Sequence, residues 1–181
     1  MAKAIGMIEF KTVSAGITAA DQMVKAANVE ILEAQVVCPG KYIALITGEL
    51  SAVNAAVETG INTRSEEYID SFVLGNPDES IFAAIYGSAV VEGVSALGVL
   101  ETYDASAIIV AADVAAKTAQ VTLIELRIAK GMCGKSYMLI TGEVAACEAA
   151  IEKAKLSVEG GMFLDSSVIA RPDDQIIKSI V

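Results

Sequence analysis

Hydrophobic and polar residues alternate along the first 76 residues with the two periods that distinguish strands from helices. Four short apolar stretches are bounded by glycine or polar residues, which is typical of strands: residues 4–10, 29–37, 42–49 and 68–76. Two longer stretches carry apolar side chains at helical spacing, which predicts helices over residues 15–27 and 50–60. We expect Ser14 to cap the first helix and Gly60 to end the second.

The predicted order is strand, helix, strand, strand, helix, strand. This is the split β-α-β arrangement, in which four antiparallel strands form one sheet and two helices cover one of its faces. We therefore predict an α+β fold of the ferredoxin-like type.

The second half of the chain repeats the first. At an offset of 92, residues 4–29 align with residues 96–121, and 12 of the 26 positions are identical. At an offset of 94, residues 40–49 match residues 134–143 at seven of ten positions, and at 95, residues 71–81 meet residues 166–176. The increase of the offset from 92 to 95 along the chain predicts a small insertion near residues 129–135 of the second copy and another before its last strand.

Two copies of a unit of this length indicate duplicated domains rather than a solenoid. We assign the first domain to residues 1–90 and the second to residues 94–181. The junction between them, residues 86–95, is short and rich in small side chains.

Composition narrows the function. The chain has 181 residues, of which 54% are apolar, and its mean hydropathy of +0.56 suggests that further faces are buried against copies of itself. A net charge of −10 argues against a nucleic-acid partner. No stretch of about 18 apolar residues lacks a charge, which argues against a transmembrane span, and the start lacks a signal-peptide layout. We therefore expect a cytoplasmic protein without a membrane partner.

The chain has no histidine, which excludes Ser/His/Asp and Cys/His nucleophile systems and any histidine-bound metal. It also lacks a phosphate-binding glycine loop, because "GKS" at residues 134–136 has no upstream glycine of a P-loop. The acidic pairs created by the duplication, such as Glu9 with Glu101, are read as structural rather than catalytic. We do not expect an enzyme.

Several linked motifs, in order and in both copies, resemble the bacterial microcompartment shell domain. They are "AIGMIE", "AADQMVKAANV" and "GKYIALITGE", the last followed by an Ala/Val-rich helix that ends in "TG". Two such domains in one chain resemble the tandem-domain shell proteins. The "CPGK" loop of this chain makes it similar to the iron–sulfur-bearing tandem-domain shell protein of propanediol-utilisation compartments.

The resemblance implies a homotrimer that mimics the hexamers of single-domain relatives and tiles with other shell proteins in the compartment shell. Three pseudo-equivalent pairs of domains close a six-membered ring. Encapsulated redox enzymes are further expected partners. In the family, the loop between the second and third strands lines the central pore, which here implicates Pro39, Gly40 and Lys41 in the first copy and Met132, Cys133 and Gly134 in the second.

Cys38 is the candidate ligand. From the residues alone it is either a small buried side chain or a ligand, because no local C-x-x-C spacing accompanies it. The resemblance implies that three copies of Cys38, one per subunit, bind one four-iron, four-sulfur ([4Fe-4S]) cluster in the pore. Such a cluster would transfer electrons across the shell or be delivered to enzymes inside.

The other two cysteines have different expected roles. Cys133 lies one place away from the direct equivalent of Cys38, and it is a further pore thiol, a backup ligand or an inert small residue. Cys147 lies among alanines on a helix and is expected in the core.

Edge contacts between tiles are also implied by the resemblance. They fall on Lys25 and Asn28 in the first copy, and on Lys117, Gln120 and Arg171 in the second. Asn76 stands where the second copy has Arg171, so alternate edges of the trimer should differ.

Two other functions remain open at this stage. The first is the same shell tile without a cluster, whose pore passes small metabolites. The second is a duplicated ferredoxin-like domain that acts as a small enzyme or a ligand-binding regulator.

Overall fold

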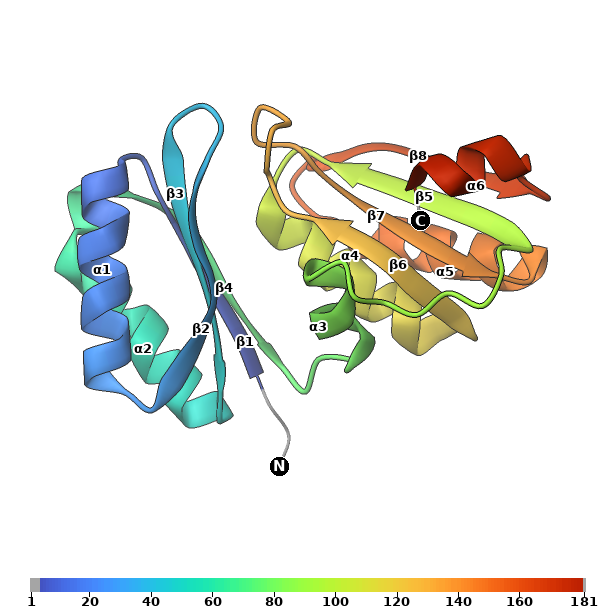
Figure 1. Ribbon diagram of the computed structural model, residues 1–181. Helices are drawn as coiled ribbons and strands as arrows, with labels where there is room; N and C mark the ends of the chain where they lie inside the picture. The colour runs from blue at the N-terminus through green and yellow to red at the C-terminus, as the bar shows by residue number, and fades with distance from the viewer. Residues whose placement is uncertain (1–3, 181) are drawn as a thin grey trace. The chain divides into compact units, whose positions relative to one another are not determined.

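The computed structural model describes residues 4–180, and the chain divides after Pro77 into two compact units (Figure 1). Unit 1 is Met1–Pro77 and unit 2 is Asp78–Val181. Residues 78–95, which connect the two repeats, pack with unit 2. The domain bounds of 1–90 and 94–181 remain a prediction about the duplicated copies.

Unit 1 has the predicted α+β fold. Its elements are β1 (Ala4–Phe10), α1 (Val13–Ala26), β2 (Val29–Val37), β3 (Lys41–Gly48), α2 (Leu50–Thr63), the short 3-10 turn η1 (Ser65–Glu67) and β4 (Tyr68–Gly75). The strands form one antiparallel sheet in the order β2-β3-β1-β4, and Figure 1 shows α1 and α2 together on one face of it.

Unit 2 repeats this topology with the sheet order β6-β7-β5-β8. Its elements are α3 (Ser80–Ile85), β5 (Ala96–Thr102), α4 (Ala105–Thr118), β6 (Val121–Arg127), β7 (Ser136–Gly142), α5 (Val144–Ser157), β8 (Phe163–Ala170) and α6 (Asp174–Ile180). The short helices α3 and α6 follow the fourth strand of each repeat and were not predicted.

Even the irregularities of the two sheets are duplicated. The register shifts between Ile31 and Glu33 on β2, and at the equivalent place, between Leu123 and Glu125, on β6. The extra residues of the second copy lie in loops: residues 128–135 connect β6 to β7, where residues 38–40 connect β2 to β3. The second insertion is also outside the helices and strands, since five residues, 158–162, join α5 to β8 where four, 64–67, lie between α2 and β4. The strand order is kept, but β6 ends two residues earlier than its counterpart β2.

Two details of the helix ends differ from prediction. Ser14 lies inside α1, and the N-cap is Thr12, whose hydroxyl accepts a hydrogen bond from the Ala15 amide. Gly60 lies inside α2, which continues to Thr63. A Cβ at Gly60 would stand 2.9 Å from Met23 Sδ and 3.0 Å from Ile8 Cδ1, so the glycine serves close packing rather than termination.

The packing of the first long helix against the sheet, α1 in unit 1 and α4 in unit 2, differs between the two units. In unit 1, a Cβ on Gly16 would meet the Tyr42 side chain at 2.4 Å, so the ring occupies the space that a side chain on the helix would need. In unit 2 the aligned pair is Ile108 on α4 and Ser136 on β7, and both are fully buried. The larger side chain of the pair is on the strand in unit 1 and on the helix in unit 2, so each pair combines one large and one small residue, as close packing requires.

We expect Gly16→Ala to destabilise the folded chain by about 1–3 kcal/mol, because the added methyl group overlaps the Tyr42 ring. Chemical denaturation measures the loss. The matched control is Gly93→Ala, since nothing lies within 4 Å of a Cβ at that position. Combining Gly16→Ala with Tyr42→Ser should cost less than the sum of the two single changes, and strict additivity would contradict the packing argument.

Candidate functional site

Cys38 lies at the tip of the β2–β3 hairpin. The turn is closed by a hydrogen bond from the Gly40 amide to the Val37 carbonyl, 2.9 Å long, and Gly40 has φ +103. That backbone conformation is one that side-chain-bearing residues rarely adopt, so the turn needs glycine here. Cys38 is half-buried, while Pro39 and Gly40 are exposed. The thiol is thus at an accessible tip rather than in the core.

Lys41, the last residue of the "CPGK" stretch, is held by the sheet. Its ammonium lies 3.2 Å from Glu9 Oε1, and Glu9 is almost fully buried on β1. A buried carboxylate needs such a partner, because an unpaired charge away from water is costly. The structure therefore ties Lys41 to Glu9 directly beside the turn at the hairpin tip.

The matching loop of unit 2 is longer and has a different conformation. Cys133 is exposed and has φ 55, and Met132 and Gly134 beside it are half-buried. The loop is anchored at its base, where the buried Ala129 amide donates to the Ser136 hydroxyl at 2.9 Å. The pore-loop residues of both copies thus lie on hairpin tips, and their place in a pore stays a prediction.

Within one chain these loops do not form a metal site. Among residues 4–180, no three side chains of Cys, Asp or Glu are grouped as metal ligands. Cys147 is fully buried on α5, as expected. Burial raises the pKa of its thiol, and the nearby Glu143 carboxylate raises it further. Each chain therefore offers one thiol at the β2–β3 tip, and any cluster would need thiols from several copies.

The predicted edge residues occupy equivalent places with different surroundings. Lys25 pairs with Asp21 one turn earlier, 2.6 Å apart, and both are exposed. Lys117 pairs with Asp113 at 2.8 Å, but Asp113 is buried. Asn28 and Gln120, which follow the two helices, are both exposed.

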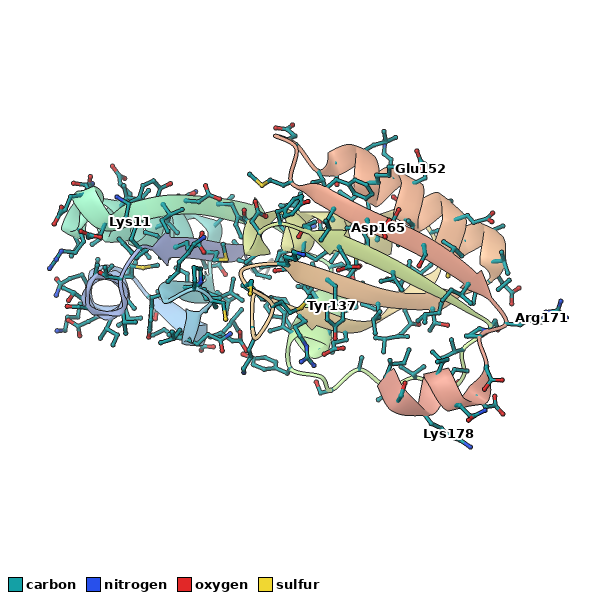
Figure 2. All side chains as sticks on the ribbon, turned by 90° about the horizontal axis from the view of Figure 1, so that it is seen from above. Lys11, Tyr137, Glu152, Asp165, Arg171 and Lys178 are labelled. Carbon is teal, nitrogen blue, oxygen red and sulfur yellow. The ribbon has the colours of Figure 1, made fainter. Side chains whose placement is uncertain are left out.

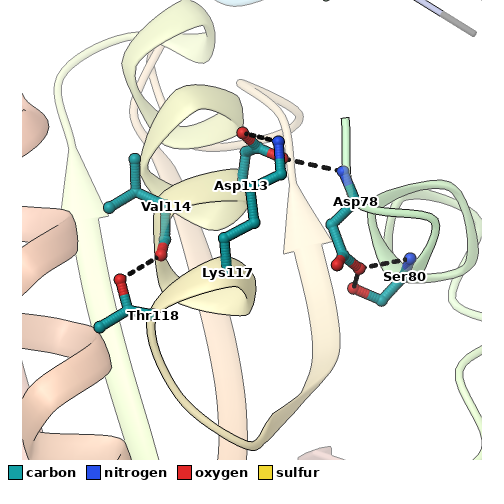
Figure 3. Close-up of polar contacts among 6 residues, drawn as sticks. All are labelled: Asp78, Ser80, Asp113, Val114, Lys117 and Thr118. Atoms are coloured by element: carbon teal, nitrogen blue, oxygen red, sulfur yellow. Dashed lines mark hydrogen bonds and ion pairs between the residues drawn. The ribbon is translucent and has the colours of Figure 1, made fainter. Parts of the chain in front are cut away.

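Buried Asp113 has a second polar partner, which offsets part of the cost of burying its charge. Its Oδ1 accepts a hydrogen bond of 2.8 Å from the Asp78 amide, and Oδ1 of Asp78 in turn accepts from the amide and the hydroxyl of Ser80. Figure 3 shows this chain of contacts between α4 and the start of α3. The contact between Asp78 and Asp113 was not predicted, although "PDES" carries the usual signature of an Asp-initiated turn.

Arg171 is exposed at the end of β8, and Figure 2 shows its side chain extending away from the sheet. Its φ is 49, and the aligned Asn76 has φ 53. Asparagine tolerates this left-handed conformation better than arginine does. Arg171 is therefore at a backbone position that favours other residues, and its contact at a tile edge stays a prediction.

A polar cluster on the sheet of unit 2 was also missed. The Tyr137 hydroxyl donates to Glu125 Oε2 at 2.7 Å, and Arg127 Nε donates to Glu125 Oε1 at 2.9 Å. The cluster faces a cavity of about 350 Å³, lined also by Gly87, Val91 and Ile180. Burial, together with the hydrogen bond and charge of Glu125, raises the pKa of Tyr137 to about 12.

No helix in residues 4–180 is long and apolar enough to cross a membrane.

Comparison with protein families shows which family the chain belongs to. The BMC domain family matches twice, at residues 4–77 and 96–172. The chain belongs to the BMC domain family. The two matches are the two repeats, so this is a tandem-domain BMC protein, and the resemblance seen in the sequence is confirmed at the level of the family.

Relatives of this tandem BMC protein match it over its whole length. The bacterial microcompartment shell protein PduT of Citrobacter freundii is 37% identical over 182 residues, which cover 100% of this chain and 99% of that protein. A crystal structure of a microcompartments protein from Desulfitobacterium hafniense DCB superimposes with a TM-score of 0.94 at 41% identity, covering 98% of this chain and 99% of that one. We conclude that the chain is a tandem-domain microcompartment shell protein related to PduT.

A more distant structure shares only the fold. The fused permuted hexameric shell protein MSM0275 from the RMM microcompartment is 23% identical, with a TM-score of 0.64 over 86% of this chain and 83% of that one. The tandem arrangement of the BMC protein thus recurs at low sequence identity.

We expect the three cysteines of the metal-free, reduced BMC protein to differ in reactivity. Cys38 and Cys133 should react with a thiol reagent in the folded protein, whereas Cys147 should react only after unfolding, because it is buried and its pKa is raised. Mass spectrometry of the labelled peptides measures this. Labelling of Cys147 as fast as Cys133 would contradict the assignment of Cys147 to the core.

We expect Tyr137 to ionise near pH 12 in the folded protein, above the ordinary value of 10.0. A raised pKa means that the folded state favours the protonated phenol. This contribution to stability is complete below pH 10 and is lost as the pH rises towards 12. The ultraviolet absorbance of the wild type minus that of Tyr137→Phe isolates the transition, and a midpoint at pH 10 would show that the cluster does not form.

Proposed function

We propose that this chain forms a trimeric tile of a microcompartment shell, and that three Cys38 thiolates bind one [4Fe-4S] cluster at the centre of the tile. Its proposed partners are two further copies of itself, other shell proteins at the tile edges and redox enzymes enclosed by the shell. When bound, the cluster would supply a one-electron redox centre.

The observation that carries the proposal is the position of Cys38. A single half-buried thiol at an exposed hairpin tip is a poor site by itself, and residues 4–180 contain no grouped ligands that could complete it within one chain. A three-fold axis near the tip would present the thiol three times. Three thiolates at one point repel each other unless a cation or a cluster neutralises them.

The donor set fits a cluster of this kind. Thiolates are the ordinary protein ligands of iron–sulfur clusters, and three of them leave one iron for water or another small ligand. Gly40 and Pro39 leave the tip free of large side chains, and a Cβ at Gly40 would meet nothing within 4 Å. Lys41 is tied to Glu9, so Cys38 is the residue of this loop that we assign to the cluster.

The alternative function is a cluster-free tile whose pore passes small metabolites. The same open tip favours it, because small and exposed residues at a ring centre leave a passage. The two functions differ in iron content and in the need for Cys38.

The deciding measurement is made on protein purified without oxygen. We expect about four irons and matching sulfide per trimer, and an electron paramagnetic resonance signal after reduction. Cys38→Ser should lose the signal and most of the iron, because the tip then lacks its ligand.

Cys133→Ser is the matched control, since it also changes a thiol on a hairpin tip, and it should keep the iron. A Cys38→Ser protein with the full signal would reject the assignment. A colourless, iron-free wild-type trimer would favour the metabolite pore.

A further inference from the structure

The chain leaves the fourth strand of each unit by the same path. Asn76 and Arg171 share a left-handed backbone conformation, and the prolines that follow, Pro77 and Pro172, are both buried. The next residue accepts an amide hydrogen bond from two positions later in each case: Asp78 from Ser80 at 3.0 Å, and Asp173 from Gln175 at 2.9 Å. The helices that these turns start, α3 and α6, are therefore equivalent elements.

The first of these helices is firmly docked within unit 2. Helix α3 packs against β6 and α4, as Figure 1 shows, and its Ile81 and Ala84 are fully buried. The hydrogen bond from the Asp78 amide to Asp113 fixes the start of the helix on α4 (Figure 3). Apolar burial and one polar anchor thus define the contact.

The second helix is held much less tightly. Its last residue, Ile180, packs against an apolar cluster on the sheet of its own unit, but the side that carries Ile176 is not covered. Ile176 on α6, which is equivalent to Ile81, is 50% exposed, whereas Ile81 is 0% exposed. None of residues 174–180 is buried, and Figure 2 shows Lys178 of this helix pointing away from the sheet. An apolar helix side that its counterpart buries is left open in α6.

The matching surface is open as well, on unit 1. Ile17 on α1 is 53% exposed, whereas the aligned Ile109 on α4 is 0% exposed. Ile31 on β2 is 45% exposed, whereas the aligned Leu123 on β6 is 1% exposed. Asp21, which is one turn after Ile17 on α1, pairs with Lys25, just as Asp113 pairs with Lys117. We call Ile17, Asp21 and Ile31 the α1–β2 patch.

We propose that α6 of one copy docks on the α1–β2 patch of a second copy, as α3 docks on α4 and β6. In this contact Ile176 covers Ile17 and Ile31, and the Asp173 amide donates to the Asp21 carboxylate. The proposal rests on the trimeric tile proposed above and identifies the segment that links its subunits.

A second copy is the occupant because the contact is directional. The helix that follows one unit docks on the next unit. A contact of this kind between unlike surfaces, when it is repeated, closes into a ring if the rotation between units allows closure, as the proposed trimer requires, and otherwise continues as an open filament. Within one chain, this contact is made once, by α3 on α4 and β6. For α6 to make the same contact, it needs the equivalent surface of a unit 1, and a second copy of the chain supplies that surface.

The test is the trimer–monomer equilibrium of Ile17→Glu and of Ile176→Glu, measured by native mass spectrometry and sedimentation. We expect each change to raise the apparent dissociation constant of the trimer about tenfold or more, because a charge replaces a buried apolar side chain. Both positions are exposed in the single chain, so circular dichroism should show an unchanged fold.

The matched control is Leu156→Glu, which alters an apolar side chain on α5 that is 71% exposed and lies outside the patch. It should leave the equilibrium unchanged. Hydrogen exchange adds an independent readout: the α6 amides should be protected in the trimer and lose protection on dilution to monomer. Protection that does not depend on concentration would place α6 on its own chain and overturn the proposal.

The outcomes separate this inference from the cluster. Trimers that form equally well with Ile17→Glu or Ile176→Glu would overturn the docking of α6, whether or not they contain iron. An iron-free trimer that dissociates in both variants would support the docking and reject the cluster. A wild type that is monomeric, or that protects α6 only when another shell protein is added, would overturn the docking between copies.

Discussion

The packing of α3 on α4 and β6 is the contact on which the organisation of this protein depends. A four-stranded sheet with two helices on one face has a finished core but leaves apolar side chains on its first helix and on its edge strand. In unit 2 the chain itself covers them with α3, and Ile109 and Leu123 are buried. In unit 1 the same positions, Ile17 and Ile31, remain open to solvent. A duplicated chain of this design is complete at one of its two equivalent surfaces and incomplete at the other.

Such incompleteness suits a BMC domain protein, because a shell is built from repeated contacts between units. The β2–β3 hairpin gains its importance in the same way. One thiol at an exposed tip has little chemistry of its own, but the proposed tile multiplies it by three. The longer β6–β7 loop has lost this equivalence, because Cys133 stands on a different turn with its own backbone conformation. The two units share a fold and differ at their hairpin tips, so the proposed ligand is carried by only one of the two copies.

The fold was predictable from the sequence, since the order of strands and helices and the duplication follow from apolar spacing and from residues repeated at fixed offsets. The insertions were predictable too, because a drifting offset must place extra residues in loops. The ends of the helices were less so: Thr12 caps α1 in place of Ser14, and Gly60 serves packing against Met23. Local sequence does not distinguish a glycine that ends a helix from one that allows a neighbour to approach.

The candidate site, too, was predictable only in part from the sequence. Cys38 stands out in the sequence because of its motif, but its exposure and the Lys41–Glu9 pair are properties of the folded hairpin. The contact between Asp78 and Asp113 joins residues far apart in the chain, and the Glu125–Arg127–Tyr137 cluster joins two strands across a sheet. No spacing pattern in one copy points to either, because each depends on which elements the fold brings together.

The exchange of side-chain size between the two cores has a genetic consequence. Repeated stretches within one gene are prone to recombine, which would make the halves alike again. A crossover that combined the helix carrying Ile108 with the strand carrying Tyr42 would force two large side chains into space for one, and the reciprocal product, Gly16 with Ser136, would leave a hole. Each product would be less stable than a chain in which both cores are intact. The matched sizes therefore favour chains whose two halves stay different at these positions.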